Sequence, residues 1–481
     1  MKIPDRLIGF VEYDSHEIAF EFDQNEYVIR LYPQKDLWKQ YSRPSYVFGK
    51  NKVDYTVHEW IPENRLIGTT SAGFHVVFDI QDHPSVYSGF LSFRVHWYFL
   101  CTKSMADGKF QGFSLSGDII DSFFSPSIAI EQKHEFDETN NIPRLVVSST
   151  CSPTMQCGQF DVTDTVAASF EVDAISYASL GNFEQPIYAK SKFITTFSEP
   201  TTIETIIETF QTVIRFFIFI SYRSNISFEK LDLFVVDDKK KRDYQGIIVF
   251  PPVHNSETNP DAKRNLIVYN DIRERTAIIL DDIRTGILSI QHICDSYDAT
   301  RTYPISRVIL VLAAFERLYG GIYGKDTDRS DVYIETKEQV VKLIEQYANA
   351  CTGKQKGYAK TLKKFVENRD SSYASNMIYA LRDCKDIMVP FVSRRYKGEY
   401  DEIIEDLGNR IGEIRNGVAH FKLNFDLEPI HLSDIHIAEE LFYAVELKHI
   451  GLSTRESQIA INRLFREHIY FKEETTDVQE E

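Results

Sequence analysis

The sequence predicts an α+β protein of more than one domain: a β-rich N-terminal half of sandwich or barrel type, followed by an all-helical bundle. The chain has 481 residues, which corresponds to about three ordinary domains or two large ones. Apolar and polar residues alternate with a period of two before residue 200, as in strands with one buried face. After residue 265 the apolar residues are spaced three and four apart, as in helices.

The composition narrows the class of protein. Lys and Arg total 54 against 71 Asp and Glu, a net charge of −17, which excludes a chain that coats DNA or an anionic membrane non-specifically. A local nucleic-acid site remains possible. Six cysteines are few, the N-terminus has no apolar signal core, and every apolar run is shorter than the ~20 residues of a membrane span. We therefore expect a cytoplasmic protein without a membrane anchor.

Strands are expected throughout the first part of the chain. Alternation is clearest in residues 74–80 and 91–99. Further strands are predicted at residues 27–32, 111–116, 145–149 and 160–172, between Gly, Pro, Asn and Asp residues. About ten short strands before residue 200 favour a sandwich or barrel.

A transition follows these strands. Residues 200–222 form an amphipathic pattern that predicts a helix, and strands are expected at 231–236 and 247–250. The four cations at 239–242 are interpreted as a solvated hairpin tip, with RNA contact as the alternative. Residues 254–263 are polar and predict a linker, so the β-rich domain is assigned to residues 1–264. It contains no catalytic cluster, which favours a sensor or regulatory role.

The rest of the chain is predicted to be helical over residues 265–472, with an acidic tail at 473–481. Apolar spacing predicts helices at residues 280–294, 308–315, 340–348, 358–366, 377–389, 404–421, 439–449 and 456–470. The segment 308–315 is apolar nearly all round, which predicts a buried helix.

The familiar catalytic signatures are missing: there is no phosphate-binding glycine loop, serine elbow, zincin helix or paired zinc-ligand motif. One arginine–histidine pattern remains, Arg415 and His420, and its spacing recurs only at Arg463 and His468. Arg415 is followed by polar Asn416 and small residues, which leave room for a ligand. Bulky apolar residues surround the second pair, which predicts a packed helix edge for His468.

The segment 415–420, late in a helical domain, resembles the defining motif of HEPN domains. The layout of a β-rich half before a helical half is similar to ApeA-type anti-phage proteins of bacteria. The resemblance implies an endoribonuclease that needs neither metal nor cofactor. It also implies a homodimer or larger oligomer formed through the helical domain. In such proteins, cleavage of tRNA or other host RNA stops phage multiplication by abortive infection, and we expect a phage-derived trigger to act on the β-rich domain.

The residues of the motif suit this chemistry. RNA carries its own nucleophile, the 2′-hydroxyl, and a histidine can remove or return its proton at cellular pH. An arginine fork matches phosphate oxygens. Attack on phosphorus would leave a 2′,3′-cyclic phosphate and a 5′-hydroxyl.

The spacing adds a geometric constraint. On a straight helix, positions five apart point about 140° from each other, so Arg415 and His420 do not share a face, whereas Asn416 and His420 do. Gly417 could loosen the helix, the long Arg415 side chain could reach around, or a second protomer could complete the site. All three favour Asn416 as part of the site.

Glu316 is a supporting candidate. It follows the apolar segment 308–315, where an unpaired carboxylate would be costly, so we expect it to contact a cation. HEPN-like domains often have an acid on an early helix that supports the motif, and the resemblance makes Arg415 the predicted partner. The alternative is that Glu316 ends its helix at the surface beside Arg317.

Residues 352–366 contain five lysines and no acid. These are Lys354, Lys356, Lys360, Lys363 and Lys364. They predict a basic helix face that could contact an RNA backbone, although the pattern favours a merely solvated face. The alternative function is a non-catalytic HEPN-type module that binds RNA or a nucleotide, or that dimerises.

Overall fold

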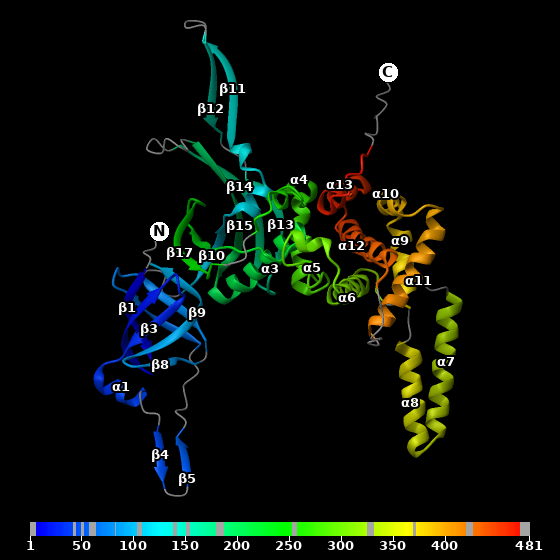
Figure 1. The fold of residues 1–481 in the computed structure, drawn as a ribbon, viewed down its shortest axis with the longest axis horizontal. Helices are drawn as coiled ribbons and strands as arrows, with labels where there is room; N and C mark the ends of the chain where they lie inside the picture. Colours follow the sequence, from blue (N-terminus) through cyan, green and yellow to red (C-terminus); the bar gives the residue numbers. More distant parts are fainter. Residues whose placement is uncertain are drawn as a thin grey trace. The chain divides into compact units, whose positions relative to one another are not determined.

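The structure is a computed structural model. It describes residues 6–41, 45–49, 52–56, 64–81, 83–102, 108–137, 142–150, 154–178, 187–252, 257–324, 331–368, 372–419 and 427–471. The chain forms two compact units, a β-rich one and a helical one (Figure 1). The first comprises Met1–Asp121, Ser125–Phe210 and Ser227–Ser256, and the second Ser122–Phe124, Gln211–Ile226 and Glu257–Glu481. The predicted α+β class, with strands before helices, is confirmed.

The first part of the β-rich unit is a closed barrel. It consists of six antiparallel strands: β1 (Arg6–Tyr13), β2 (His16–Asp23), β3 (Val28–Tyr32), β6 (Arg65–Thr70), β7 (His75–Ile80) and β9 (Phe90–Cys101). The barrel closes because β7 pairs with β6 along one edge and with β9 along the other. Strand β7 therefore has no free edge there. Two smaller strand pairs and a short helix belong to the same region: β4 (Ser45–Gly49) with β5 (Lys52–Thr56), β8 (Ser85–Tyr87) on β9, and α1 (Lys35–Tyr41).

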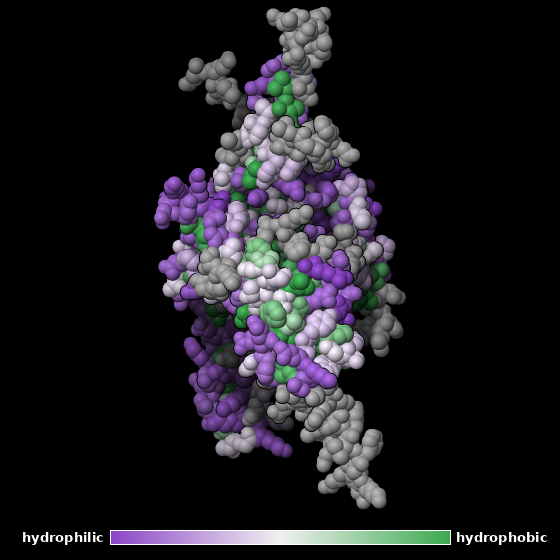
Figure 2. Space-filling view, turned by 90° about the vertical axis from the view of Figure 1, so that its left-hand side faces the viewer, coloured by the Kyte–Doolittle hydropathy of each residue, from purple (hydrophilic) through white to green (hydrophobic). Residues whose placement is uncertain are grey.

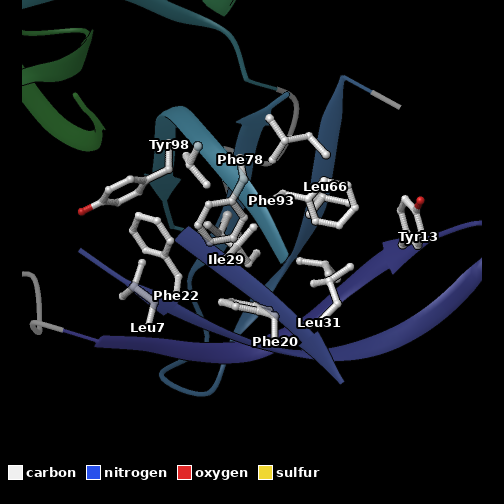
Figure 3. Packing of buried hydrophobic residues seen from close by; sticks show 14 of the residues in the cluster. Leu7, Tyr13, Phe20, Phe22, Ile29, Leu31, Leu66, Phe78, Phe93 and Tyr98 are labelled. Carbon is white, nitrogen blue, oxygen red and sulfur yellow. The ribbon is translucent and has the colours of Figure 1, made fainter. Parts of the chain in front are cut away.

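Aromatic side chains fill the barrel (Figure 3). The rings of Phe20 and Phe22 lie 5.2 Å and 5.1 Å from the ring of Phe78, and the ring of Phe22 lies 5.0 Å from that of Tyr98. These residues occupy alternate positions on their strands, as the period of two requires. On the face shown in Figure 2, exposed apolar residues lie among hydrophilic ones, as is usual for protein surfaces.

The same sheet continues beyond the barrel. From β9 it passes through β17 (Arg242–Val249), β16 (Lys230–Val236), β10 (Phe110–Leu115), β15 (Ile187–Thr201), β14 (Ala167–Ala178) and β13 (Met155–Asp161). One edge of β9 serves both parts, because residues 91–94 pair with β3 and residues 98–101 pair with β17. The remaining elements are α2 (Asp118–Phe123) and the hairpin of β11 (Ile130–Asp137) and β12 (Ile142–Ser149).

The structure differs from the predicted strand at 160–172 and from part of the predicted hairpin tip at 239–242. The single strand predicted at 160–172 is wrong, because β13 and β14 are separated by a turn. The Thr163 hydroxyl accepts a hydrogen bond from the Val166 amide (3.1 Å), and such local bonds favour turns. The predicted hairpin tip is confirmed for Lys239, Lys240 and Lys241, which are exposed between β16 and β17. Arg242 is only partly exposed, and it pairs with Glu171 on β14.

The helical part begins with α3 (Ile203–Ser221), which confirms the helix predicted at 200–222. The later helices are α4 (Tyr269–Ile272), α5 (Thr276–Thr285), α6 (Ile305–Ile322), α7 (Asp331–Ala350), α8 (Gly353–Asn368), α9 (Tyr373–Asp383), α10 (Lys385–Arg395), α11 (Tyr400–Ala419), α12 (Pro429–His449) and α13 (Thr454–Phe465). Apart from Ser122–Phe124, the compact helical unit starts at Gln211 within α3 and resumes at Glu257, inside the segment predicted as a linker. The sequence placed its start at residue 265.

Helix α12 is the centre of the helical unit. Helices α6, α9, α10, α11 and α13 pack around it, and residues 434–447 are buried apart from His436. No helix among the described residues is long and apolar enough to cross a membrane.

Several predicted helices end earlier than the apolar spacing suggested. The helix expected at 280–294 stops at Thr285, because Gly286 adopts a left-handed conformation (φ 79°) that caps it. The helix expected at 456–470 stops at Phe465, where Arg466 is left-handed (φ 60°). Residues 377–389 belong to two helices, α9 and α10, that meet at Cys384. Spacing alone does not reveal these backbone changes.

Two glycines bring α11 against α9. A Cβ atom at Gly408 would lie 2.4 Å from Cγ1 of Ile378, and one at Gly412 would lie 3.1 Å from Cβ of Ala374. The glycines therefore permit an approach of the two helices that a larger residue would prevent, and α11 carries the arginine of the motif.

We expect Gly408→Ala to lower the free energy of unfolding by about 1–3 kcal/mol, because the added methyl group overpacks the contact with Ile378. Gly357→Ala on α8 is the matched control. Nothing lies within 4 Å of the added carbon there, so it should stabilise by up to about 1 kcal/mol. Urea unfolding followed by circular dichroism measures both, and equal effects of the two substitutions would contradict the proposed close packing.

Candidate functional site

Helix α11 carries the first residues of the candidate motif. It continues as a helix through Gly417 to Ala419, so Gly417 does not loosen it. The side chain of Arg415 is 40% exposed, and Asn416 is exposed. His420 lies outside the described residues, so its position relative to Arg415 remains a prediction.

Glu316 lies on α6 and contacts Arg415. An Nη2 atom of Arg415 is 3.6 Å from Oε2 of Glu316, which confirms the predicted partner. The predicted burial is wrong, because Glu316 is 52% exposed. Only one face of α6 is buried, and Glu316 belongs to the other face. The alternative in which Glu316 ends its helix is also wrong, since α6 continues to Ile322.

The exposure of this ion pair limits its energetic value. Pairs of this kind contribute about 0–1 kcal/mol to stability, because water and salt screen them. Glu316 therefore does little to hold the fold together. It places the guanidinium of Arg415 at the helix surface, and a phosphate could compete for that guanidinium at low cost.

A third side chain supports this pair, and sequence reasoning missed it. The hydroxyl of Tyr373 on α9 donates a hydrogen bond to the Leu312 carbonyl of α6 (3.2 Å), and its ring lies 5.8 Å from that of Phe315. Burial and the negative charge of Glu316 raise the pKa of Tyr373 well above its usual value, while Arg415 opposes this. Tyr373 therefore stays protonated and fixes α9 to α6 beside the pair. No sequence signal links residues on three separate helices.

The five lysines of the predicted basic face all lie on α8. Lys354, Lys360 and Lys364 are exposed, whereas Lys363 is 3.0 Å from Glu345 on α7. Among the described residues, no hydrogen bond or ion pair joins Lys354, Lys360 or Lys364 to Arg415 or Glu316. These three lysines are therefore exposed to solvent, but no contact among the described residues connects them with the motif.

The second arginine–histidine pair is not assembled. Arg463 pairs with Asp271 (2.5 Å). The packed helix edge predicted for His468 is wrong, because α13 ends at Phe465 and His468 is exposed beyond it.

The central helix α12 buries charged groups that sequence reasoning did not find. The carboxylate of Glu439 accepts hydrogen bonds from Arg307 (2.8 and 3.1 Å) and from Tyr303 (2.6 Å). Asp434 likewise accepts two from Arg410 (2.8 Å each). Both carboxylates are completely buried, so these pairs connect α12 to its neighbours at the cost of desolvation.

One group of three side chains among the described residues could in principle hold a metal ion: His436, Glu440 and Glu467. Arg395 already occupies both carboxylates, at 3.3 Å and 2.6 Å. Burial opposes a charged His436, but its hydrogen bonds to Glu440 and Glu467 outweigh burial and raise its pKa to about 9. A protonated imidazole cannot be a ligand, so the cluster is best explained as a buried salt-bridge network.

Comparison of the chain with protein-family models, with curated proteins and with solved structures gives no match. The resemblance to HEPN domains therefore rests on the motif and its helical setting. The structure contributes the contact between Arg415 and Glu316 and the position of Tyr373 beside it.

Proposed function

We propose that the helical unit is a metal-independent endoribonuclease of the HEPN type. The observation that supports this most directly is the ion pair between Arg415 and Glu316 (3.6 Å). It leaves a permanently charged fork accessible to a phosphate, at the end of the helix that leads into His420. Arginine stays charged at every physiological pH, which suits the binding of a phosphodiester.

The remaining steps follow from the chemistry of RNA. His420 takes the proton of the 2′-hydroxyl, the 2′-oxygen attacks the adjacent phosphorus, and the bond to the 5′-oxygen breaks. The leaving 5′-oxygen receives a proton, from the same imidazole or from that of a second protomer. Arg415 stabilises the charge that develops on the phosphate oxygens, and Asn416 orients the imidazole or a phosphate oxygen.

The wider context is part of the same proposal. Exposed lysines of α8 bind the RNA backbone, and two helical units of a homodimer or larger oligomer bring their motifs together. The β-rich unit senses a phage-derived trigger and releases the nuclease. Cleavage of tRNA or other host RNA in the cytoplasm would then stop phage multiplication by abortive infection.

The products test this proposal. Full-length protein is incubated with tRNA in EDTA, and the fragments are examined for 2′,3′-cyclic phosphate and 5′-hydroxyl ends. We expect both ends, with no loss of activity in EDTA, and far fewer fragments from an Arg415→Ala preparation. Ends carrying a 5′-phosphate, or cleavage abolished by EDTA, would contradict the mechanism. RNA that is bound but stays intact would favour the non-catalytic binding module instead.

A further inference from the structure

A second site is present in the helical unit. A pocket of about 400 Å³ lies between the segment before α6, His436 of α12 and the turn that follows α13. Glu316 is eleven residues beyond Ile305, the first residue of α6, which places it about 16 Å further along that helix. The pocket is therefore separate from the Arg415 site.

The lining of this pocket is basic. It contains Arg301, His436, Arg466 and His468 and no acidic side chain. This local excess of positive charge contrasts with the chain's net charge of −17. A pocket of this volume lies within the range of small-molecule sites.

The positive charges are only partly compensated. No described residue accepts a hydrogen bond from the side chain of Arg301 or His468. Arg466 donates to the Thr300 hydroxyl (2.9 Å) and lies 3.7 Å from the ring centre of Tyr297. Burial and the positive charge of Arg301 lower the pKa of Arg466, and Tyr297, Asp261 and Asp298 only partly oppose this. An anion placed between the two arginines would relieve this repulsion.

The turn after α13 is built to present its cations. Arg466 and His468 are both left-handed (φ 60° and 52°), and the acid between them does not line the pocket. That acid, Glu467, is buried and bound to Arg395. The side chain of Asn462 holds the turn through two hydrogen bonds to the backbone of residue 469 (2.9 and 3.0 Å).

Backbone strain points to the same place. Within the described helical unit, four non-glycine residues are left-handed, and three of them line this pocket: Tyr222, Arg466 and His468. Such conformations cost about 1–3 kcal/mol each and concentrate at binding sites.

We propose that this pocket binds a small phosphate monoester that carries an aromatic ring, with the phosphate between Arg301, Arg466 and His468. Guanidinium forks and imidazoles match phosphate oxygens, and a monoester is close to a dianion at neutral pH. Leu464 and Phe465 form an apolar wall for the ring. Such a ligand could be a phosphorylated phenol or a mononucleotide, which share this chemistry.

Calorimetric titration of the full-length protein tests the proposal. The probes are phenyl phosphate and AMP, each compared with its uncharged counterpart, phenol or adenosine. We expect at least one of the two phosphates to bind at least tenfold more tightly than its uncharged counterpart. The phosphate that binds more tightly shows whether the pocket prefers a phosphorylated phenol or a mononucleotide. Arg301→Glu should weaken that binding by about 10- to 100-fold. Arg301 is exposed and unpaired among the described residues, so its replacement should not disturb folding.

Two further variants separate a binding effect from a structural one. Lys342→Glu on α7 makes the same change of charge away from the pocket and should leave affinity unchanged. His468→Gln should weaken binding while keeping the unliganded melting temperature. The proposal is overturned if neither phosphate binds, or if Arg301→Glu binds as tightly as wild type. The readout is binding rather than RNA cleavage, so this outcome is independent of the proposed nuclease.

Discussion

Replacing Arg307 by methionine is expected to lower the free energy of unfolding by about 3–5 kcal/mol. The guanidinium binds the carboxylate of Glu439 through two hydrogen bonds, and Glu439 is completely buried on α12. The Arg307 guanidinium also donates hydrogen bonds to the carbonyls of Thr300 and Thr302 (3.0 and 2.6 Å), and these bonds hold the segment before α6. Methionine fills part of the volume but leaves the carboxylate without its counter-charge.

Urea unfolding followed by circular dichroism measures this loss. The double variant Arg307→Met with Glu439→Met should recover part of it, because no uncompensated charge remains. Arg382→Met is the matched control, since Arg382 pairs with Glu405 at the surface and should cost less than about 1 kcal/mol. If Arg307→Met is no more destabilising than Arg382→Met, the buried pair does not organise the helical unit.

The second large effect concerns catalysis. We expect His420→Ala to reduce the rate of RNA cleavage by about 10²–10⁴-fold, because the general base is lost. Arg415→Ala should cost about 10²–10³-fold, since it removes the charge that faces the developing oxyanion. Arg415→Lys keeps the charge without the fork and should fall between wild type and Arg415→Ala.

Single-turnover rates on tRNA distinguish these variants. Glu316→Gln should reduce the rate by about tenfold while leaving stability almost unchanged, because Glu316 positions Arg415 and the pair is exposed. His83→Ala and Arg382→Ala remove an exposed histidine and an exposed arginine elsewhere and should cleave normally. Wild-type cleavage by His420→Ala would refute the assignment of the motif.

The sequence predicts the order and type of most elements because their periodicity is local. The period of two locates β7 and β9, and spacing of three and four locates α6, α11 and α12. The sequence did not distinguish a closed barrel from a sandwich, because the barrel closes through the pairing of β7 with β9, and no local pattern specifies which strands pair or in which register. The ends of α5 and α13 depend on single left-handed residues, Gly286 and Arg466.

The candidate site was likewise predicted only in part. The contact of Glu316 with Arg415 was expected from family resemblance, whereas the physical argument for a buried carboxylate failed because α6 exposes one face. Tyr373 and the pocket around Arg301 could not be found from sequence. Their neighbours come from separate helices, and only tertiary packing brings them together.

The shared edge of β9 has a consequence for how the β-rich unit unfolds. Residues 91–94 and 98–101 belong to one continuous strand, yet the first stretch pairs with β3 and the second with β17. Loss of β9 would open both ladders at once, so the barrel and the rest of the sheet should melt as one cooperative block. A barrel excised after Cys101 would also expose the backbone groups that β17 now covers, and such a bare edge recruits other chains into aggregates.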